Sequence, residues 1–183
     1  MRVISGKYRG LNLVEFEGDD IRPTADRVKE SLFNIIASRV NGADVLDLFC
    51  GSGSLGIECL SRGARSVAFN DCSPRSLTVL SKNLAKLKGV DVYTITKSDY
   101  TAFLHAAKRP FDIIFLDPPY RYDYGEDALK IISERGLLKK DGVVIYERDM
   151  KFYGLLRGFE IIDERKYGRT YLTFFAAKLE EKV

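Results

Sequence analysis

The sequence has no hydrophobic run long enough to cross a membrane, and its first residues lack the apolar core of a secretory signal. The longest apolar runs, such as VLDLF and IIFL, are far shorter than the roughly 20 residues that a spanning helix needs. The opening stretch MRVISGKYRG has no apolar h-region. We therefore expect a cytoplasmic protein that does not bind a membrane.

Metal-binding side chains are also scarce. The chain has three cysteines, Cys50, Cys59 and Cys72, and a single histidine, His105. Their spacing fits no zinc-ligand pattern, so we expect no metal site and reduced, half-buried cysteines. A Cys–His catalytic pair would have to use His105, which lies in the helix-like stretch YTAFLHAAKR, and this reading is disfavoured. The role of Cys50, just ahead of a glycine loop, stays open.

Charge is present in both signs and is unevenly distributed. The net charge is only +3, but residues 62–109 hold nine lysines and arginines against three acids. The first ten residues add Arg2, Lys7 and Arg9 with no acid. Such stretches fit contact with phosphates, although a lysine-rich solvated surface explains them equally well.

The hydrophobic pattern predicts strands that alternate with helices. With 183 residues, 45% of them hydrophobic, the chain suits one α/β domain with a small appendage. We predict an N-terminal hairpin extension over residues 1–20 and a main domain over residues 21–183. Central strands are expected at 44–49, 66–71, 91–96, 111–117 and 142–149, and helices at 24–40, 54–63, 74–89, 100–109 and 126–135. This alternation predicts a doubly wound, mostly parallel sheet of Rossmann type, and two further strands around KYGR predict a C-terminal antiparallel edge hairpin.

A glycine loop, DLFCGSGSLG, follows the first central strand and opens a helix. Gly51, Gly53 and Gly56 have the G-x-G-x-x-G spacing of nucleotide-binding turns, and Asp71 ends the next strand, where an acid can bind ribose hydroxyls. The ligand is a nicotinamide dinucleotide or S-adenosylmethionine. Asp47, on the strand before the loop, would repel a pyrophosphate and attract a sulfonium with its ammonium group, so we favour the second ligand. Alternatively, Asp47 caps the following helix.

The stretch FLDPPY places Asp117, Pro118, Pro119 and Tyr120 at the end of the fourth central strand. Two prolines terminate the strand and fix the Pro118 carbonyl. The carboxylate and that carbonyl can accept hydrogen bonds from an exocyclic amine of a base, and Tyr120 can stack on the base. With an ordinary pKa of about 4, Asp117 would orient the amine rather than act as a strong base. A simple strand terminator is the alternative.

Taken together, these motifs resemble those of the RsmD family, whose members methylate the N2 amine of a guanine in bacterial 16S ribosomal RNA. The resemblance covers the whole chain, in MRVISGKYRGLNL, IRPTADRVKESLFNII, VLDLFCGSGSLGIECLSRGA, FLDPPY and KYGRTYLTFF. It implies a class I S-adenosylmethionine-dependent methyltransferase with a seven-stranded sheet and an N-terminal extension that grips RNA. It also implies that the substrate is 16S rRNA or the assembling small ribosomal subunit. We expect a monomer, although no sequence feature sets the oligomeric state.

The resemblance assigns roles to individual residues. The expected cofactor contacts are Asp47, Phe49, Gly51, Gly53, Asp71, Asp99, Arg22 and Thr24. The expected catalytic turn is Asp117, Pro118, Pro119 and Tyr120. Independently of the resemblance, the charged and aromatic hairpin residues Arg2, Lys7, Tyr8 and Arg9 are expected to hold RNA phosphates and stack on bases. Lys82, Lys86 and Lys88 are a second candidate patch or, equally, a solvated helix face. The chain departs from the family in FNDCSP, where a Val-Glu pair is more usual and Asp71 is one methylene shorter than glutamate.

Other functions remain open from the sequence. An adenine-N6 or other amine methyltransferase acting on DNA or another RNA would use the same turn chemistry. A non-catalytic RNA-binding module is a third possibility, although the glycine loop and Asp117 are both intact. An NAD-linked oxidoreductase is disfavoured because no second substrate domain is evident.

Overall fold

The sheet at the centre of the molecule has the predicted strand arrangement. The computed structural model describes residues 1–15, 26–119, 124–154 and 156–178. Its seven-stranded sheet has the order β3-β2-β1-β4-β5-β7-β6. The strands are β1 Asp44–Asp47, β2 Ser66–Asp71, β3 Tyr93–Lys97, β4 Phe111–Leu116, β5 Leu138–Arg148, β6 Phe159–Tyr167 and β7 Thr170–Ala177. Strands β1 to β5 pair in parallel, whereas β7 is antiparallel to both β5 and β6, which confirms the predicted edge hairpin.

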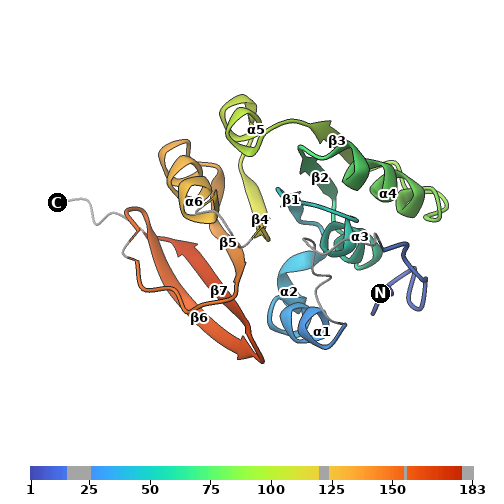
Figure 1. Cartoon of the computed structure of the whole chain (residues 1–183), viewed down its shortest axis with the longest axis horizontal. Helices are drawn as coiled ribbons and strands as arrows, with labels where there is room; N and C mark the ends of the chain where they lie inside the picture. Colours follow the sequence, from blue (N-terminus) through green and yellow to red (C-terminus); the bar gives the residue numbers. More distant parts are fainter. Residues whose placement is uncertain (16–25, 120–123, 155, 179–183) are drawn as a thin grey trace.

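Helices cover both faces of this sheet. Those seen in the described residues are α1 Asp26–Ile35, α2 Ala37–Val40, α3 Ser54–Ser61, α4 Pro74–Leu84, α5 Tyr100–Ala106 and α6 Tyr124–Glu134. Helices α1 to α4 pack on one face, and α5 and α6 lie on the other (Figure 1). The fold is therefore the three-layer α/β sandwich that alternating strand and helix patterns favour.

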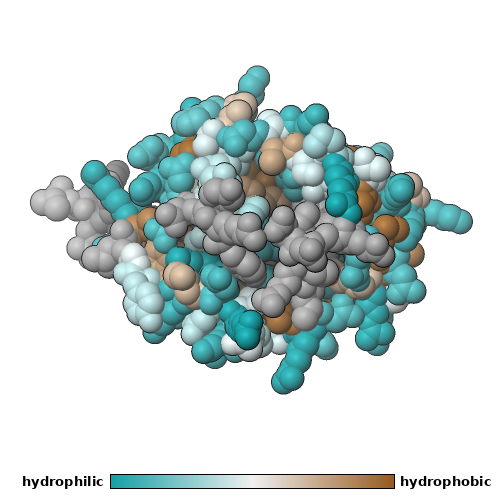
Figure 2. Space-filling view, viewed as in Figure 1, coloured by the Kyte–Doolittle hydropathy of each residue, from teal (hydrophilic) through white to brown (hydrophobic). Residues whose placement is uncertain are grey.

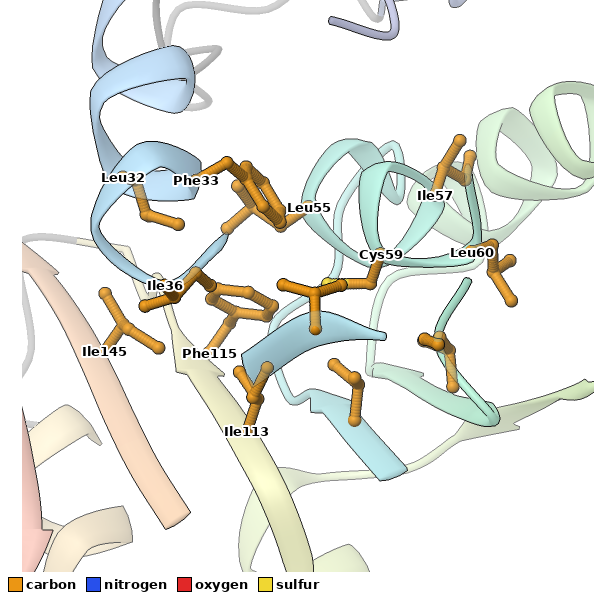
Figure 3. Packing of buried hydrophobic residues seen from close by; sticks show 14 of the residues in the cluster. Leu32, Phe33, Ile36, Leu55, Ile57, Cys59, Leu60, Ile113, Phe115 and Ile145 are labelled. Atoms are coloured by element: carbon orange, nitrogen blue, oxygen red, sulfur yellow. The ribbon is translucent and has the colours of Figure 1, made fainter. Parts of the chain in front are cut away.

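Successive side chains of β4 point to opposite faces of the sheet and so enter the two hydrophobic cores. Ile113 and Phe115 face α1 and α3, whereas Ile114 and Leu116 face α5 and α6. Figure 3 shows the first core, where the ring of Phe33 from α1 packs on that of Phe115 with centroids 6.0 Å apart. Because β4 is buried on both sides, it is a rigid base for the turn that follows it.

Several element boundaries differ from the prediction: α4 ends at Leu84 rather than at residue 89, α5 ends at Ala106 rather than at 109, and β3 begins at Tyr93 rather than at 91. The helix expected over residues 24–40 is interrupted at Ile36, which lies between α1 and α2. Ile36 and Val40 are still buried, so the apolar periodicity continues across the interruption. Strand β5 begins at Leu138 rather than at residue 142, and its pairing with β4 shifts register between Phe111 and Ile113.

The N-terminal segment forms a short antiparallel loop rather than a long hairpin. Arg2 and Asn12 form an isolated bridge, and the Val3 N–H donates to the Leu11 carbonyl at 2.9 Å. Val3 and Leu13 enter the same core as α1 and α3. The predicted boundary at residue 20 lies outside the described residues and stays a prediction.

A buried carboxylate attaches this segment to helix α3. Glu58 is fully buried, and its two oxygens accept the N–H groups of Ile4 at 2.8 Å and Ser5 at 3.0 Å. The same carboxylate accepts from Arg62 Nε at 2.7 Å and lies 3.7 Å from the buried ammonium of Lys29. Helix α3, which begins at the glycine loop, therefore also holds the N-terminal segment.

Candidate active site

Four acids meet at one edge of the sheet. Asp47 and Asp71 are the last residues of β1 and β2, Asp99 is two residues beyond β3, and Asp117 directly follows β4. These four strands are parallel neighbours, so their carboxyl ends lie together. This is the edge where open α/β sheets bind ligands. The structure therefore gathers the predicted acids from four separate stretches of sequence.

The glycine loop has the tight geometry that its spacing predicts. Gly51 and Gly53 have φ values of +52° and +80°, in the left-handed region. The Gly51 N–H donates to Asp71 Oδ2 at 2.9 Å, which ties the loop to the end of β2. A Cβ at Gly53 would overlap the Leu80 side chain, and one at Gly56 would overlap the Phe69 ring. The loop thus combines a tight left-handed turn with close packing of α3 on the sheet.

Asp47 lies beneath this loop. Its residue is only 2% exposed, and its Oδ2 accepts the Gly56 N–H at 3.0 Å. The helix cap that the sequence left as an alternative is therefore present in the structure. Burial raises the pKa of Asp47 from 3.8 to about 7, and the nearby charge of Asp71 adds to the rise. The site thus holds a carboxylate that is costly to ionise without a cation nearby.

Asp117 lies beside a second acid that the sequence did not single out. Leu116 of β4 pairs with Tyr146 of β5, so the next residues, Asp117 and Glu147, are neighbours. Glu147 is only 6% exposed. Desolvation raises the pKa of Asp117 well above its usual range, and the charges of Glu147 and Asp47 raise it further. The expectation of a pKa of about 4 was wrong, because the sequence alone does not reveal this crowding of acids.

The other residues of the catalytic turn differ in exposure. Pro118 is buried and Pro119 is exposed, so the first proline is fixed by packing and the second faces solvent. Tyr120 lies outside the described residues, as do Arg22 and Thr24. Their predicted contacts stay predictions.

Asp99 and Phe49 flank the site on the side of α5. Asp99 caps this helix, accepting from the Thr101 N–H at 2.9 Å, and the Thr101 hydrogen bonds lower the pKa of Asp99. The Phe49 ring lies 5.4 Å from the Tyr100 ring, which in turn lies 5.2 Å from that of Tyr124. Asp99 is exposed, so it remains free to contact a ligand as well as its helix.

The sequence contains a signal that could have identified Glu147 as a site residue. In the stretch VVIYER, Glu147 follows an apolar run at the carboxyl end of the strand, which is the edge where the other strands also end. A buried acid at the carboxyl end of a parallel strand indicates a role in the site, because taking a carboxylate out of water is costly. Glu147 was therefore not predicted as a site residue, because the stretch was expected only to form a strand.

The two candidate basic patches form one surface. Arg2, Lys7 and Arg9 are exposed on the N-terminal loop. The Tyr8 hydroxyl donates to the Lys88 carbonyl at 2.6 Å, which joins the loop to the segment after α4. The face drawn in Figure 2 is largely hydrophilic, with hydrophobic residues visible only in small areas. Such a face suits a polar partner better than an apolar one.

The cysteines are not half-buried as expected. Cys50 and Cys59 are buried, and Cys72 is exposed. Burial raises the pKa values of Cys50 and Cys59, which disfavours their reactive thiolate forms. In the described part of the chain, no group of three or more histidine, cysteine, aspartate or glutamate side chains is arranged to hold a metal ion. No helix there is both long and apolar enough to span a bilayer.

Comparisons with known proteins agree with the site. The family model described as "Conserved hypothetical protein 95" matches residues 1–176. The chain is 36% identical to ribosomal RNA small subunit methyltransferase D of Haemophilus influenzae, over 81% of this chain and 79% of that protein. It is 34% identical to the protein of the same name from Escherichia coli K12, over 82% and 76%. The solved structure of Escherichia coli yhhF superposes with a TM-score of 0.87 at 30% identity, covering 97% of this chain and 98% of that one.

Proposed function

The chain belongs to the RsmD methyltransferase family, and from this we propose that it methylates the N2 amine of a guanine in 16S ribosomal RNA, using S-adenosylmethionine. The observation that carries the proposal is the gathering of Asp47, Asp71 and Asp117 around a left-handed glycine loop at one sheet edge. The expected class I methyltransferase fold is confirmed by the strand order and by the structural match.

The residues present fit S-adenosylmethionine. Asp71 lies at the end of β2, where an acid accepts hydrogen bonds from ribose hydroxyls, and its Oδ2 already fixes Gly51. The left-handed glycines Gly51 and Gly53 give the loop the tight turn that lets a backbone approach a ligand closely. Two acids with raised pKa values, Asp47 and Asp117, would be stabilised in their ionised forms by a sulfonium and an ammonium group. Phe49 and Asp99, on the α5 side of the site, would then contact the end of the cofactor away from its sulfonium and ammonium groups.

The chain's own residues would bind and orient the amine. Asp117 and the Pro118 carbonyl would accept its hydrogen bonds, localise the nitrogen lone pair and aim it. When bound, S-adenosylmethionine supplies a methyl group on a sulfonium, and the sulfur keeps the bonding electron pair as S-adenosylhomocysteine. The raised pKa of Asp117 suits it to take the proton that the methylated nitrogen gives up. This role extends the orienting one that the sequence suggested.

The RNA assignment has separate support. Small-subunit ribosomal RNA is the substrate in the names of two relatives. A base must leave its stack before its amine can reach such a turn, and structured RNA offers unstacked bases. Arg2, Lys7, Tyr8 and Arg9 would hold the surrounding phosphates and bases. We also infer that the protein works in the cytoplasm as a monomer on rRNA or the assembling small subunit, which light scattering would check.

Methyl transfer to RNA tests the proposal. Small subunits and 16S rRNA from a strain lacking the gene are incubated with the protein and methyl-labelled S-adenosylmethionine, then digested to nucleosides. We expect label in N2-methylguanosine, and loss of label in Asp117→Ala and Asp117→Asn. The control Asp141→Asn changes an exposed acid on β5 away from the turn and should retain activity. Label in N6-methyladenosine would show that the target base is adenine rather than guanine. No label on any RNA would refute the proposal.

A further inference from the structure

A cavity of about 490 Å³ lies at the tip of the β6–β7 hairpin, and the site described above does not include it. We call it the tip pocket. Its lining includes the cations Lys151, Lys166 and Arg169 and the aromatic residues Tyr153 and Tyr171. Asp149 is the one acid in this lining. The pocket is thus aromatic and carries an excess of positive charge.

Strand register places the tip pocket at the catalytic edge. Tyr171 of β7 pairs with Arg148, the last residue of β5, and β5 pairs on its other side with β4. The hairpin turn at Gly168 and Arg169 therefore lies at the same end of the sheet as Asp117. Two strand spacings of about 4.8 Å separate β4 from β7, so the tip pocket lies at least about 10 Å from Asp117 across the sheet, and the turn extends further along the strands.

One side chain fixes the loop that presents Tyr153. Phe152 is buried, its ring meets the Phe175 ring edge-on at 5.2 Å, and its N–H donates to Glu164 Oε2 at 3.3 Å. The next side chain, Tyr153, is 84% exposed. A large aromatic ring held outward by a buried neighbour is a pre-formed stacking surface, since little ordering remains when a ligand binds.

The cations complete a surface for single-stranded nucleic acid. The Lys166 ammonium lies over the Tyr171 ring, 5.1 Å from its centroid, and Arg169 is exposed at the turn. Lys151 also faces Glu164, at 3.8 Å, so part of its charge is already balanced. Aromatic rings beside cations are how proteins hold unpaired bases and their phosphates without reading sequence.

We propose that the tip pocket binds a nucleotide next to the methylated base, with its base stacked on Tyr153 and its phosphate near Lys166 and Arg169. This inference rests on the proposed function. The tip pocket would give the RNA a second contact, at the C-terminal hairpin, in addition to the contact at the N-terminal loop. The bound RNA would then cross the catalytic turn.

Steady-state kinetics on 16S rRNA gives the first test. Tyr153→Ala should raise the KM for RNA about tenfold and leave kcat and S-adenosylmethionine affinity unchanged, whereas Tyr153→Phe should retain the wild-type KM. Arg169→Ala should reduce the slope of log affinity against log salt by about 0.7. The control Lys140→Ala removes an exposed cation near the other end of β5 and should change neither quantity. An unchanged KM in Tyr153→Ala would overturn the proposal.

Fluorescence gives a second readout that needs no activity. The chain has no tryptophan, so Tyr153→Trp places a single indole in the pocket. Added 16S rRNA should quench it, and should not quench Ile95→Trp, an exposed position on the distant strand β3. Quenching without methyl transfer by the wild type would retain the pocket and refute the proposed function. Methyl transfer without selective quenching of Tyr153→Trp would retain the proposed function and refute RNA binding at the tip pocket.

Discussion

Replacing Asp47 by asparagine should stabilise the ligand-free protein at neutral pH. The pKa of Asp47 rises from 3.8 to about 7, so its ionisation costs the folded state about 4 kcal/mol, at about 1.4 kcal/mol per pKa unit. The protonated form stabilises the fold fully below about pH 4, and this contribution is lost as the pH rises through about 7. Asparagine keeps an oxygen that can accept the Gly56 N–H but cannot ionise.

Urea unfolding between pH 5 and pH 8 measures this effect. We expect the stability gap between Asp47→Asn and wild type to grow in favour of the variant by about 3 kcal/mol over that range. S-adenosylmethionine should bind the variant about tenfold more weakly at pH 8, because a charged acceptor is lost. Asp99→Asn is the control: the pKa of Asp99 is lowered, so its contribution is lost only below about pH 4 and its gap should stay constant. A constant gap for Asp47→Asn, or a variant less stable at pH 8, would refute the reasoning.

Three further substitutions test other parts of the site. Glu58→Gln should destabilise the protein by about 3–5 kcal/mol in urea unfolding, because the buried Lys29 ammonium loses its carboxylate partner and is left with the neutral Arg2 carbonyl. Lys29→Met in the same chain should recover part of the loss, and no recovery would contradict the pairing. Glu147→Gln should lower the pKa of Asp117 and so move the acid limb of the kcat/KM–pH profile to lower pH. A shift of this limb to higher pH would argue against the proximity of Asp117 and Glu147. Gly53→Ala should abolish S-adenosylmethionine binding in calorimetry, because φ is +80°, and wild-type affinity would show that the loop tolerates a side chain.

Local patterns predicted most of the fold because they report burial directly. Strand β2 was expected over residues 66–71, where it lies, since polar and glycine-rich stretches bound a short apolar run. The interruption at Ile36 was not predicted, because the apolar side chains keep their spacing across it. Periodicity indicates which face is buried and does not detect one residue that leaves the helix.

The long-range polar contacts were beyond sequence reasoning for a different reason. Glu58 meets the Ile4 and Ser5 N–H groups across more than fifty residues, and no local pattern marks that pairing. The same holds for Asp117 and Glu147, which become neighbours only through the β4–β5 register. Individual acids at strand ends were predictable, whereas their mutual effect on pKa depends on how the strands align.

The crowding of acids favours one of the two ligand classes that the glycine loop left open. Desolvation raises the pKa values of Asp47 and Asp117, and neighbouring acids add to the rise: Asp71 acts on Asp47, and Glu147 and Asp47 act on Asp117. A pyrophosphate would bring further negative charge to the same edge and would have to bind against that repulsion. A ligand with a sulfonium and an ammonium group instead offsets it, and the carboxylates would ionise as the ligand binds. Affinity for S-adenosylmethionine should therefore rise with pH through about 7, whereas a dinucleotide's affinity should fall over the same range.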